Sequence, residues 1–218
     1  MHIFEIVLKL FEIQQKRFKD SSLVTVHRKG WSDKVQTFRI TVPAGESELA
    51  GLFAPAGKWK TAPQLNGTVE TIPLADFVTE QGIFDPVSYV LIDVEGKEPN
   101  VIRGMKLERN RHIFPLFQYE LGGTWTDSRH DADQWGQYGI AVYLRALGYN
   151  LYLAGADGGE GSKKPVLLSL HPEFFRFTCL RPEIDVGGNL LAVHTSFIDS
   201  GLWEHLQKFV VVPKPQFV

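Results

Sequence analysis

The sequence predicts a single three-layer α/β domain with a mainly parallel sheet. Segments with strand-like alternation and segments with helical spacing follow one another along most of the chain, which is typical of strands joined by helical crossovers. Residues 87–92 are almost all apolar, as expected of a strand that is buried on both faces of a parallel sheet. The length of 218 residues fits one domain, and a chain of this size buries roughly 70% of its unfolded surface.

In the first half of the chain, a short strand over 2–6 precedes a helix over 7–18, whose apolar residues recur at helical spacing. Alternating β-branched residues predict strands over 22–31 and 35–42, separated by a turn at Ser32-Asp33. The stretch from Pro43 to Gly67 is rich in proline and glycine and is predicted to be a long loop, which at this length inside a compact domain is usually functional or mobile. Residues 68–82 then predict a strand and a short helix.

In the second half, the strand over 87–96 is followed by a helix that has Pro99 in its first turn. A second buried strand is predicted to end in Glu120, and a later helix is predicted to stop at Gly148. The predicted segments, in order, are a helix over 98–110, a strand over 112–121, a loop over 122–136, a helix over 137–149, strands over 150–155 and 189–195 with a glycine-rich turn over 156–164 between them, and a tail over 197–218 packed on the outside.

Composition and charge exclude several classes of function. The net charge is −2 and the pI is about 6.4, so we expect no nucleic-acid partner and no attraction to an anionic membrane. No run approaches the roughly 20 apolar residues of a membrane-spanning helix. The single cysteine, Cys179, excludes an intramolecular disulfide and a cysteine-rich zinc site. One unpaired cysteine fits a reducing compartment, so a cytoplasmic location is expected.

Carboxylates stand at the ends of the predicted parallel strands. The strand ends carry Glu5, then Asp93 with Glu95, then Glu120. Ligands of open α/β sheets bind at this carboxyl edge, which makes these acids candidate binding or catalytic groups. Asp93 directly follows apolar strand residues, so its charge must be paired or face solvent. Plainer interpretations stay open, because Glu5 can cap the next helix and Glu95, like Glu98, can complement a helix dipole.

The loop over 122–136 carries further candidates, with His130 as a group for substrate binding or proton transfer. Its acids Asp127, Asp131 and Asp133 are either solvated or, together with Asp93 and Glu120, ligands for a hard cation such as Mg²⁺. The remaining candidates are interpreted as structural, and they are His112, His171 and Cys179. The sequence contains no nucleophile elbow, phosphate loop or HExxH zinc motif.

The order of motifs resembles the FkbM-type S-adenosylmethionine-dependent methyltransferases. The segment "YVLIDVEGKEPNVIRGM" is the strongest match, because it resembles the family's strand that ends in D-x-E-G-x-E and continues into a helix. The segments "HIFEIVLKLFEIQQKRF" and "VTVHRKGWSD" are similar to its second and third strands, and "PLFQYEL", "LRALGYNLYLAG" and "GGNLLAV" to its later ones. The resemblance covers residues 1–196.

This resemblance implies a Rossmann-like class I methyltransferase sheet with an antiparallel last strand. It implies methyl transfer from S-adenosylmethionine to a hydroxyl of a sugar or other small molecule, and no metal-binding residue is assigned. The cofactor-binding residues would be Glu5 and Asp33, and the catalytic residues Asp93 and His130. The residues lining the acceptor would be Glu95, Glu120 and Trp125.

The family's glycine-rich first motif is expected upstream of Glu5, so the resemblance also implies a domain that lacks its first strand, cofactor loop and first helix. Two other hypotheses stay open. The chain can be a non-catalytic binding or interaction module derived from this fold. It can also be a metal-dependent enzyme that uses Asp93, Glu95 and Glu120.

Overall fold

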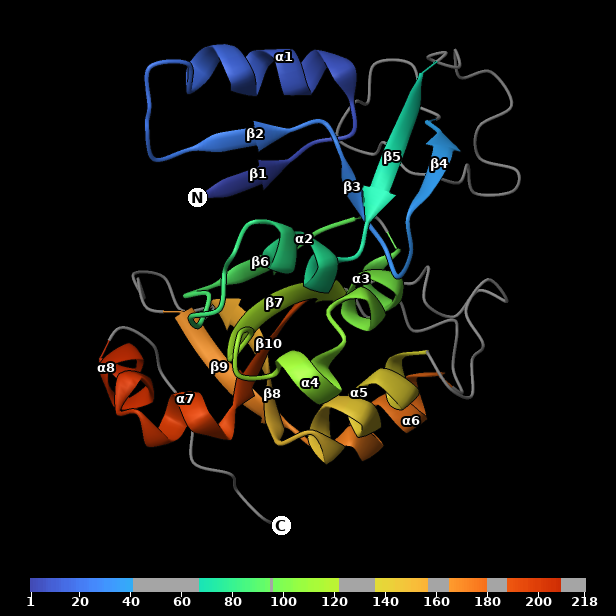
Figure 1. Cartoon of the computed structure of the whole chain (residues 1–218). Coiled ribbons are helices and arrows are strands. Elements are labelled where there is room, and N and C mark those ends of the chain that lie inside the picture. The colour runs from blue at the N-terminus through green and yellow to red at the C-terminus, as the bar shows by residue number, and fades with distance from the viewer. Residues whose placement is uncertain (41–66, 95, 122–135, 157–164, 180–187, 209–218) are drawn as a thin grey trace. The chain divides into compact units, whose positions relative to one another are not determined.

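The computed structural model describes residues 1–40, 67–94, 96–121, 136–156, 165–179 and 188–208 (Figure 1). They form an α/β protein with mixed sheets. The chain divides into two compact units, of which the first comprises Met1–Gln81 with Asn100–Met105 and the second Gly82–Pro99 with Lys106–Val218. None of the helices in the described part of the chain has the length and apolar character that a bilayer crossing requires.

The first unit begins with a β-α-β arrangement. Strand β1 (His2–Phe4) pairs in parallel with β2 (Thr25–His27), and helix α1 (Leu8–Arg17) connects them. Lys16 and Arg17 lie in the last turn of α1, where positive side chains complement the helix dipole. The predicted strand and helix are therefore confirmed in this segment.

A three-stranded sheet completes the first unit. The central strand β5 (Thr68–Ile72) pairs in parallel with β3 (Gly30–Trp31) and antiparallel with β4 (Gln36–Arg39). Helix α2 (Leu74–Glu80) follows directly, with Pro73 at its N-cap and Asp76 in its first turn. The predicted loop over 43–67 lies outside the described residues except at Gly67.

Aromatic rings and a small aliphatic cluster stabilise the first unit. The ring of Phe4 lies 4.7 Å from His27, 4.6 Å from Trp31 and 4.9 Å from Phe77, measured between centroids. A separate apolar cluster consists of Val7, Ile40 and Val69, with Ile6, Leu10 and Phe38 packed against it. Helix α1 has no fully buried residue, and it contributes to the aliphatic cluster through the partly buried Leu10.

The second unit is built on a five-stranded sheet in the order β6-β7-β10-β8-β9. Its strands are β6 (Val90–Ile92), β7 (Leu116–Leu121), β8 (Tyr149–Ala156), β9 (Pro165–Leu170) and β10 (Gly188–His194). Only β6 and β7 pair in parallel. The last strand, β10, lies between β7 and β8 and is antiparallel to both, as predicted for the last strand.

The prediction of a mainly parallel sheet is wrong for this unit. Although β6, β7 and β8 run in one direction, the insertion of β10 between β7 and β8 makes two pairings antiparallel, and the β8–β9 pair adds a third. The predicted burial of β6 on both faces is also wrong, since the exposed fractions of Tyr89 and Leu91 are 45% and 54%. Strand β6 has one described neighbour and lies at the sheet edge.

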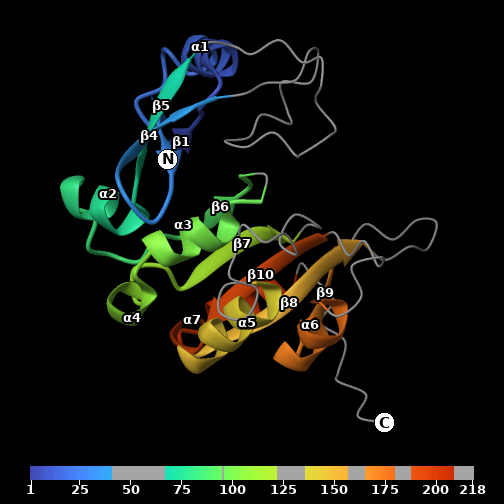
Figure 2. The ribbon, with the colours of Figure 1, turned by 90° about the vertical axis from the view of Figure 1, so that its right-hand side faces the viewer.

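Helices lie on both faces of this sheet (Figures 1 and 2). Helices α7 (Thr195–Asp199) and α8 (Leu202–Gln207) cover one face, where Trp203 packs on Tyr152 with ring centroids 4.9 Å apart. Helices α5 (Gln137–Ala146) and α6 (Pro172–Cys179) lie on the other. Within the predicted tail over 197–218, α7 and α8 thus pack on the sheet, and residues 209–218 lie outside the described ones.

Two helix predictions differ in their outcome. The stop at Gly148 is confirmed, because α5 ends at Ala146 and Gly148 takes φ +91°, a conformation that favours glycine. The single helix over 98–110 is instead two helices, α3 (Glu98–Gly104) and α4 (Leu107–Asn110). The break falls at Lys106, whose φ of 49° is incompatible with a continuous helix. Strand β9 and helix α6 were not predicted.

Candidate functional site

The structure describes four of the predicted site residues. Asp93 and Glu120 lie in the second unit, whereas Glu5 and Asp33 lie in the first. The remaining candidates lie outside the described residues, and they are Glu95, Trp125 and His130, together with Asp127, Asp131 and Asp133. The described part of the candidate site in the second unit lies at the carboxyl ends of β6 and β7, where Asp93 and Glu120 stand.

Asp93 and Glu120 form a carboxyl pair at this edge. Ile92 stands opposite Tyr119 in the parallel register, so the next residue of each strand, Asp93 and Glu120, falls in the same row. Burial raises the pKa of Glu120, and the charge of Asp93 and a hydrogen bond between the two side chains raise that pKa further. Because two adjacent carboxylates repel each other, a proton on one of them is stabilised by the other.

The turn that follows Asp93 is held by Glu98. This side chain is only 1% exposed, and its Oε1 accepts hydrogen bonds from the backbone N–H groups of Val94 (3.0 Å) and Gly96 (3.2 Å). Gly96 takes φ +89°, which favours glycine. Glu98 therefore has a structural role here, because its hydrogen bonds fix the backbone beside Asp93.

A row of polar side chains next to the carboxyl pair was missed by the sequence analysis. The hydroxyl of Tyr89 donates to Oε1 of Gln118 (2.7 Å), and Nε2 of Gln118 donates to Oδ1 of Asn189 (2.9 Å). The register places Asn189 opposite Glu120. Alternation along β7 is the one signal that points to this row, since Gln118 and Glu120 are the polar positions of an otherwise apolar strand.

In the first unit, Glu5 caps the start of α1. Its Oε1 accepts a hydrogen bond from the backbone N–H of Val7 (2.8 Å), which is the N-cap residue of the helix. Burial raises the pKa of Glu5, although backbone hydrogen bonds from Val7 and Ile6 oppose the rise. The structure therefore shows Glu5 in the capping role that the sequence left open.

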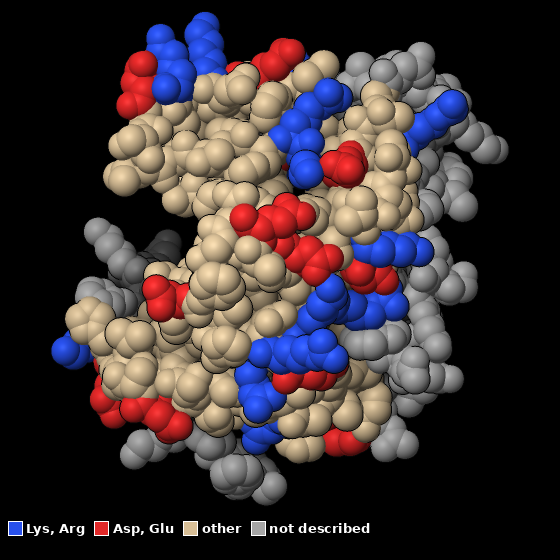
Figure 3. All heavy atoms as spheres, viewed as in Figure 1, with Lys and Arg blue, Asp and Glu red and all other residues tan. Residues whose placement is uncertain are grey.

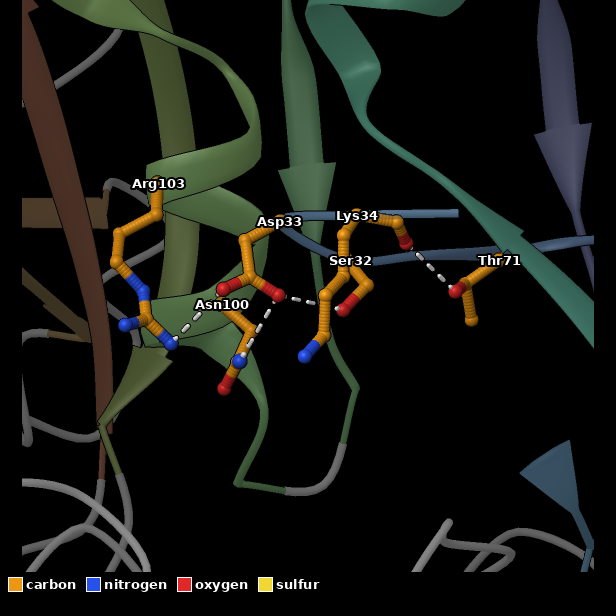
Figure 4. A network of polar contacts seen from close by, with 6 residues as sticks. All are labelled: Ser32, Asp33, Lys34, Thr71, Asn100 and Arg103. Carbon is orange, nitrogen blue, oxygen red and sulfur yellow. Dashed lines mark hydrogen bonds and ion pairs between the residues drawn. The ribbon is translucent and has the colours of Figure 1, made fainter. Parts of the chain in front are cut away.

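Asp33 is the centre of a polar network in the first unit (Figure 4). It accepts hydrogen bonds from Ser32 Oγ (3.2 Å) and Asn100 Nδ2 (3.3 Å), and it forms an ion pair with Arg103 (3.3 Å). Burial raises the pKa of Asp33, but the contacts with Asn100, Arg103 and Ser32 outweigh burial and hold that pKa below its usual value. These contacts support a structural role for Asp33.

The same turn approaches the helix end very closely. A Cβ atom on Gly104 would stand 2.0 Å from the carbonyl oxygen of Ser32 and 2.9 Å from its carbonyl carbon. Real Cβ atoms are essentially never closer than 3.0 Å to such atoms, so only glycine fits. The glycine and the Asp33 network together join the turn after β3 to the end of α3.

Charge is distributed unevenly over the second unit. Basic side chains gather over α4 on the face seen in Figure 3, where Lys106, Arg109 and Arg111 are exposed. The carboxyl edge of β6 and β7 carries acids and amides instead. Within the described ranges, no group of three or more His, Cys, Asp or Glu residues could hold a metal ion. The arrangement at the edge can therefore accept a proton and bind hydroxyl groups.

Compared with models of protein families, with curated proteins and with solved structures, the chain matches none of them. The resemblance to the FkbM-type methyltransferases therefore depends on the sequence motifs themselves.

Proposed function

We propose that this chain is an S-adenosylmethionine-dependent methyltransferase that methylates a hydroxyl group. The observation that carries the proposal is the carboxyl pair of Asp93 and Glu120 at the carboxyl edge of parallel strands. In the reaction, the acceptor oxygen attacks the methyl carbon, the bond from that carbon to the sulfonium sulfur breaks, and the hydroxyl proton passes to a base. Positioning and proton removal are the tasks left to the protein.

The carboxyl pair suits the task of proton acceptor. Because its pKa is raised, Glu120 is a stronger base than an ordinary glutamate, while Asp93 remains available to hold the hydroxyl group. A hydroxyl that donates to one carboxylate also places its proton near the other, since Asp93 and Glu120 are neighbours in the register of the two strands. His130, outside the described residues, stays a second candidate base.

The resemblance assigns the cofactor ribose to Glu5, which a titration can test. We expect the chain to bind S-adenosylmethionine and S-adenosylhomocysteine in isothermal titration, and Glu5→Ala to abolish that binding. Glu5→Gln is the matched control for stability, because its amide oxygen still accepts the Val7 hydrogen bond while it loses the negative charge and one acceptor. Weakened binding in both variants, with unfolding temperatures unchanged in Glu5→Gln, supports a direct cofactor contact.

Three results would contradict the proposal. A folded wild-type chain that binds neither compound is not a methyltransferase by itself, and a non-catalytic binding module then becomes the better hypothesis. Equal cofactor affinity in wild type and both Glu5 variants would show that Glu5 only caps α1. Methyl transfer that survives Asp93→Asn combined with Glu120→Gln would remove the carboxyl pair from the mechanism.

A further inference from the structure

The described helices cover only part of one face of the five-stranded sheet. Helices α7 and α8 pack on the part formed by Leu116, Leu191 and Tyr152. The part formed by β6 lies open, since 45% of Tyr89 and 54% of Leu91 are exposed. Leu91 stands opposite Gln118 in the register, and Tyr89 reaches the same glutamine, so these side chains share the face.

This open face joins an apolar surface to a line of hydrogen-bonding groups. The hydrogen bond from Tyr89 to Gln118 fixes the orientation of the phenol ring, and Gln118 is fixed in turn by Asn189. Glu120 stands opposite Asn189, and Asp93 extends the line to the sheet edge. Rigid aromatic and amide groups of this kind bind ligands without a large loss of side-chain entropy.

The chemistry of the face selects among ligands. The carboxyl pair repels anions, and the described residues offer no third ligand for a metal ion. Carboxylate and amide groups accept from and donate to hydroxyl groups, and two oxygens of one carboxylate can take a vicinal pair of hydroxyls. The exposed ring of Tyr89 and the side chain of Leu91 favour a flat apolar surface on the same ligand. A neutral sugar ring has all of these features.

We propose that this open face of the β6–β7–β10 part of the sheet binds a neutral sugar ring. The C–H face of the ring packs on Tyr89 and Leu91, and its hydroxyls bind the amides of Gln118 and Asn189 and the carboxyl pair. The inference deepens the proposed function, on which its substrate class rests, because a sugar held here presents a hydroxyl to the same carboxyl pair. Tyr89 and Gln118 would then determine specificity.

Binding is measured without any cofactor, by NMR titration of the ¹⁵N-labelled full chain. The probes are methyl β-D-glucopyranoside and methyl α-D-galactopyranoside, with tetrahydropyran as a ring that lacks the hydroxyls. We expect saturable shifts in β6, β7 and β10 with at least one glycoside and none with tetrahydropyran. Tyr89→Ala should weaken glycoside binding about tenfold, because it removes the aromatic surface.

Matched variants separate the binding face from the stability of the sheet. Leu91→Ala removes an exposed leucine from the proposed face, whereas Leu168→Ala removes a 47% exposed leucine from β9, whose partner Leu153 points away from the Tyr152 side. We expect weakened glycoside binding in Leu91→Ala only. Tyr89→Phe keeps the ring and loses only the hydrogen bond to Gln118, so it tests the face if Tyr89→Ala fails to fold.

The outcomes distinguish this inference from the proposed function. Glycoside binding at the face by a chain that binds no S-adenosylmethionine supports the sugar site and contradicts the methyltransferase. Binding of S-adenosylmethionine without glycoside shifts overturns the sugar site alone. Shifts that tetrahydropyran reproduces, or that Leu168→Ala removes as strongly as Leu91→Ala, would also overturn it, because the face would then be only a general apolar surface.

Discussion

Because Gly104 lies so close to the turn at Ser32, we expect Gly104→Ala to destabilise the protein, whereas the same substitution in an ordinary helix stabilises it. Replacing glycine by alanine inside a helix normally stabilises it by about 1 kcal/mol. Here the new methyl group would stand 2.0 Å from a backbone oxygen, whereas real Cβ atoms essentially never stand closer than 3.0 Å to such an atom. The obstacle is backbone, so no side-chain rotation can relieve the clash.

The magnitude follows from those two opposing effects. Overpacking costs typically 1–3 kcal/mol and sometimes more, and a clash with fixed backbone belongs at the upper end of that range. After subtraction of the gain in helix propensity, we expect Gly104→Ala to lower the free energy of unfolding by about 2 kcal/mol. The loss should be concentrated in the first unit, where the turn at Ser32 and the end of α3 meet.

Urea unfolding followed by circular dichroism gives the global change, and hydrogen exchange with mass spectrometry locates it. Peptides that contain the α3 segment and the turn after β3 should lose protection. Gly155→Ala is the control, because a Cβ there meets nothing within 4 Å, and it should be neutral or stabilising by about 0.5–1 kcal/mol. A Gly104→Ala protein as stable as Gly155→Ala would refute the close approach.

Two further predictions concern pH and packing. The ring nitrogens His2 Nδ1 and His27 Nε2 lie 3.0 Å apart, and burial, the charge of His2 and the charge of Lys29 lower the pKa of His27. The folded state therefore prefers the neutral ring, and stability should decrease as the pH falls below about 6.5. The urea midpoints of His27→Asn at pH 7.5 and pH 5.5 should differ less than those of the wild type, and an equal difference would contradict the assignment. Trp203→Ala should lower the free energy of unfolding by about 3–5 kcal/mol, because Trp203 is only 7% exposed. Leu202 is 54% exposed, so the control Leu202→Ala should change thermal unfolding far less. Equal effects of the two substitutions would disprove the packing of α8.

Local signals predicted many of the elements correctly. The predicted strands at 2–6 and 112–121, the helix over 7–18 and the stop at Gly148 all appear in the structure. The spacing of apolar residues and the position of glycines are properties of short segments, so they indicate helices, strands and their ends without any tertiary contact. Glu5 and Glu120 could likewise be placed at strand ends, since their position in the strand fixes where the side chains emerge.

Pairing partners could not be predicted from such signals. Strand β6 has the apolar composition of a buried central strand but lies at the edge of its sheet, and Leu91 is exposed as a result. Composition reports how apolar a segment is, whereas burial depends on what lies beside it. The patterns of the sequence did not predict strand β9 and helix α6.

In the candidate site, too, some features could be predicted from the sequence and others depend on the pairing of strands. The sequence alone identified Asp93 and Glu120 as acids at a sheet edge, because each follows a recognisable apolar strand. Only the tertiary structure determined that the two carboxyl groups stand side by side, and that Tyr89, Gln118 and Asn189 form a row beside them. Those side chains come from three strands that are far apart in the sequence, and their alignment depends on register. Register is set by long-range hydrogen bonding between strands, which no single segment encodes.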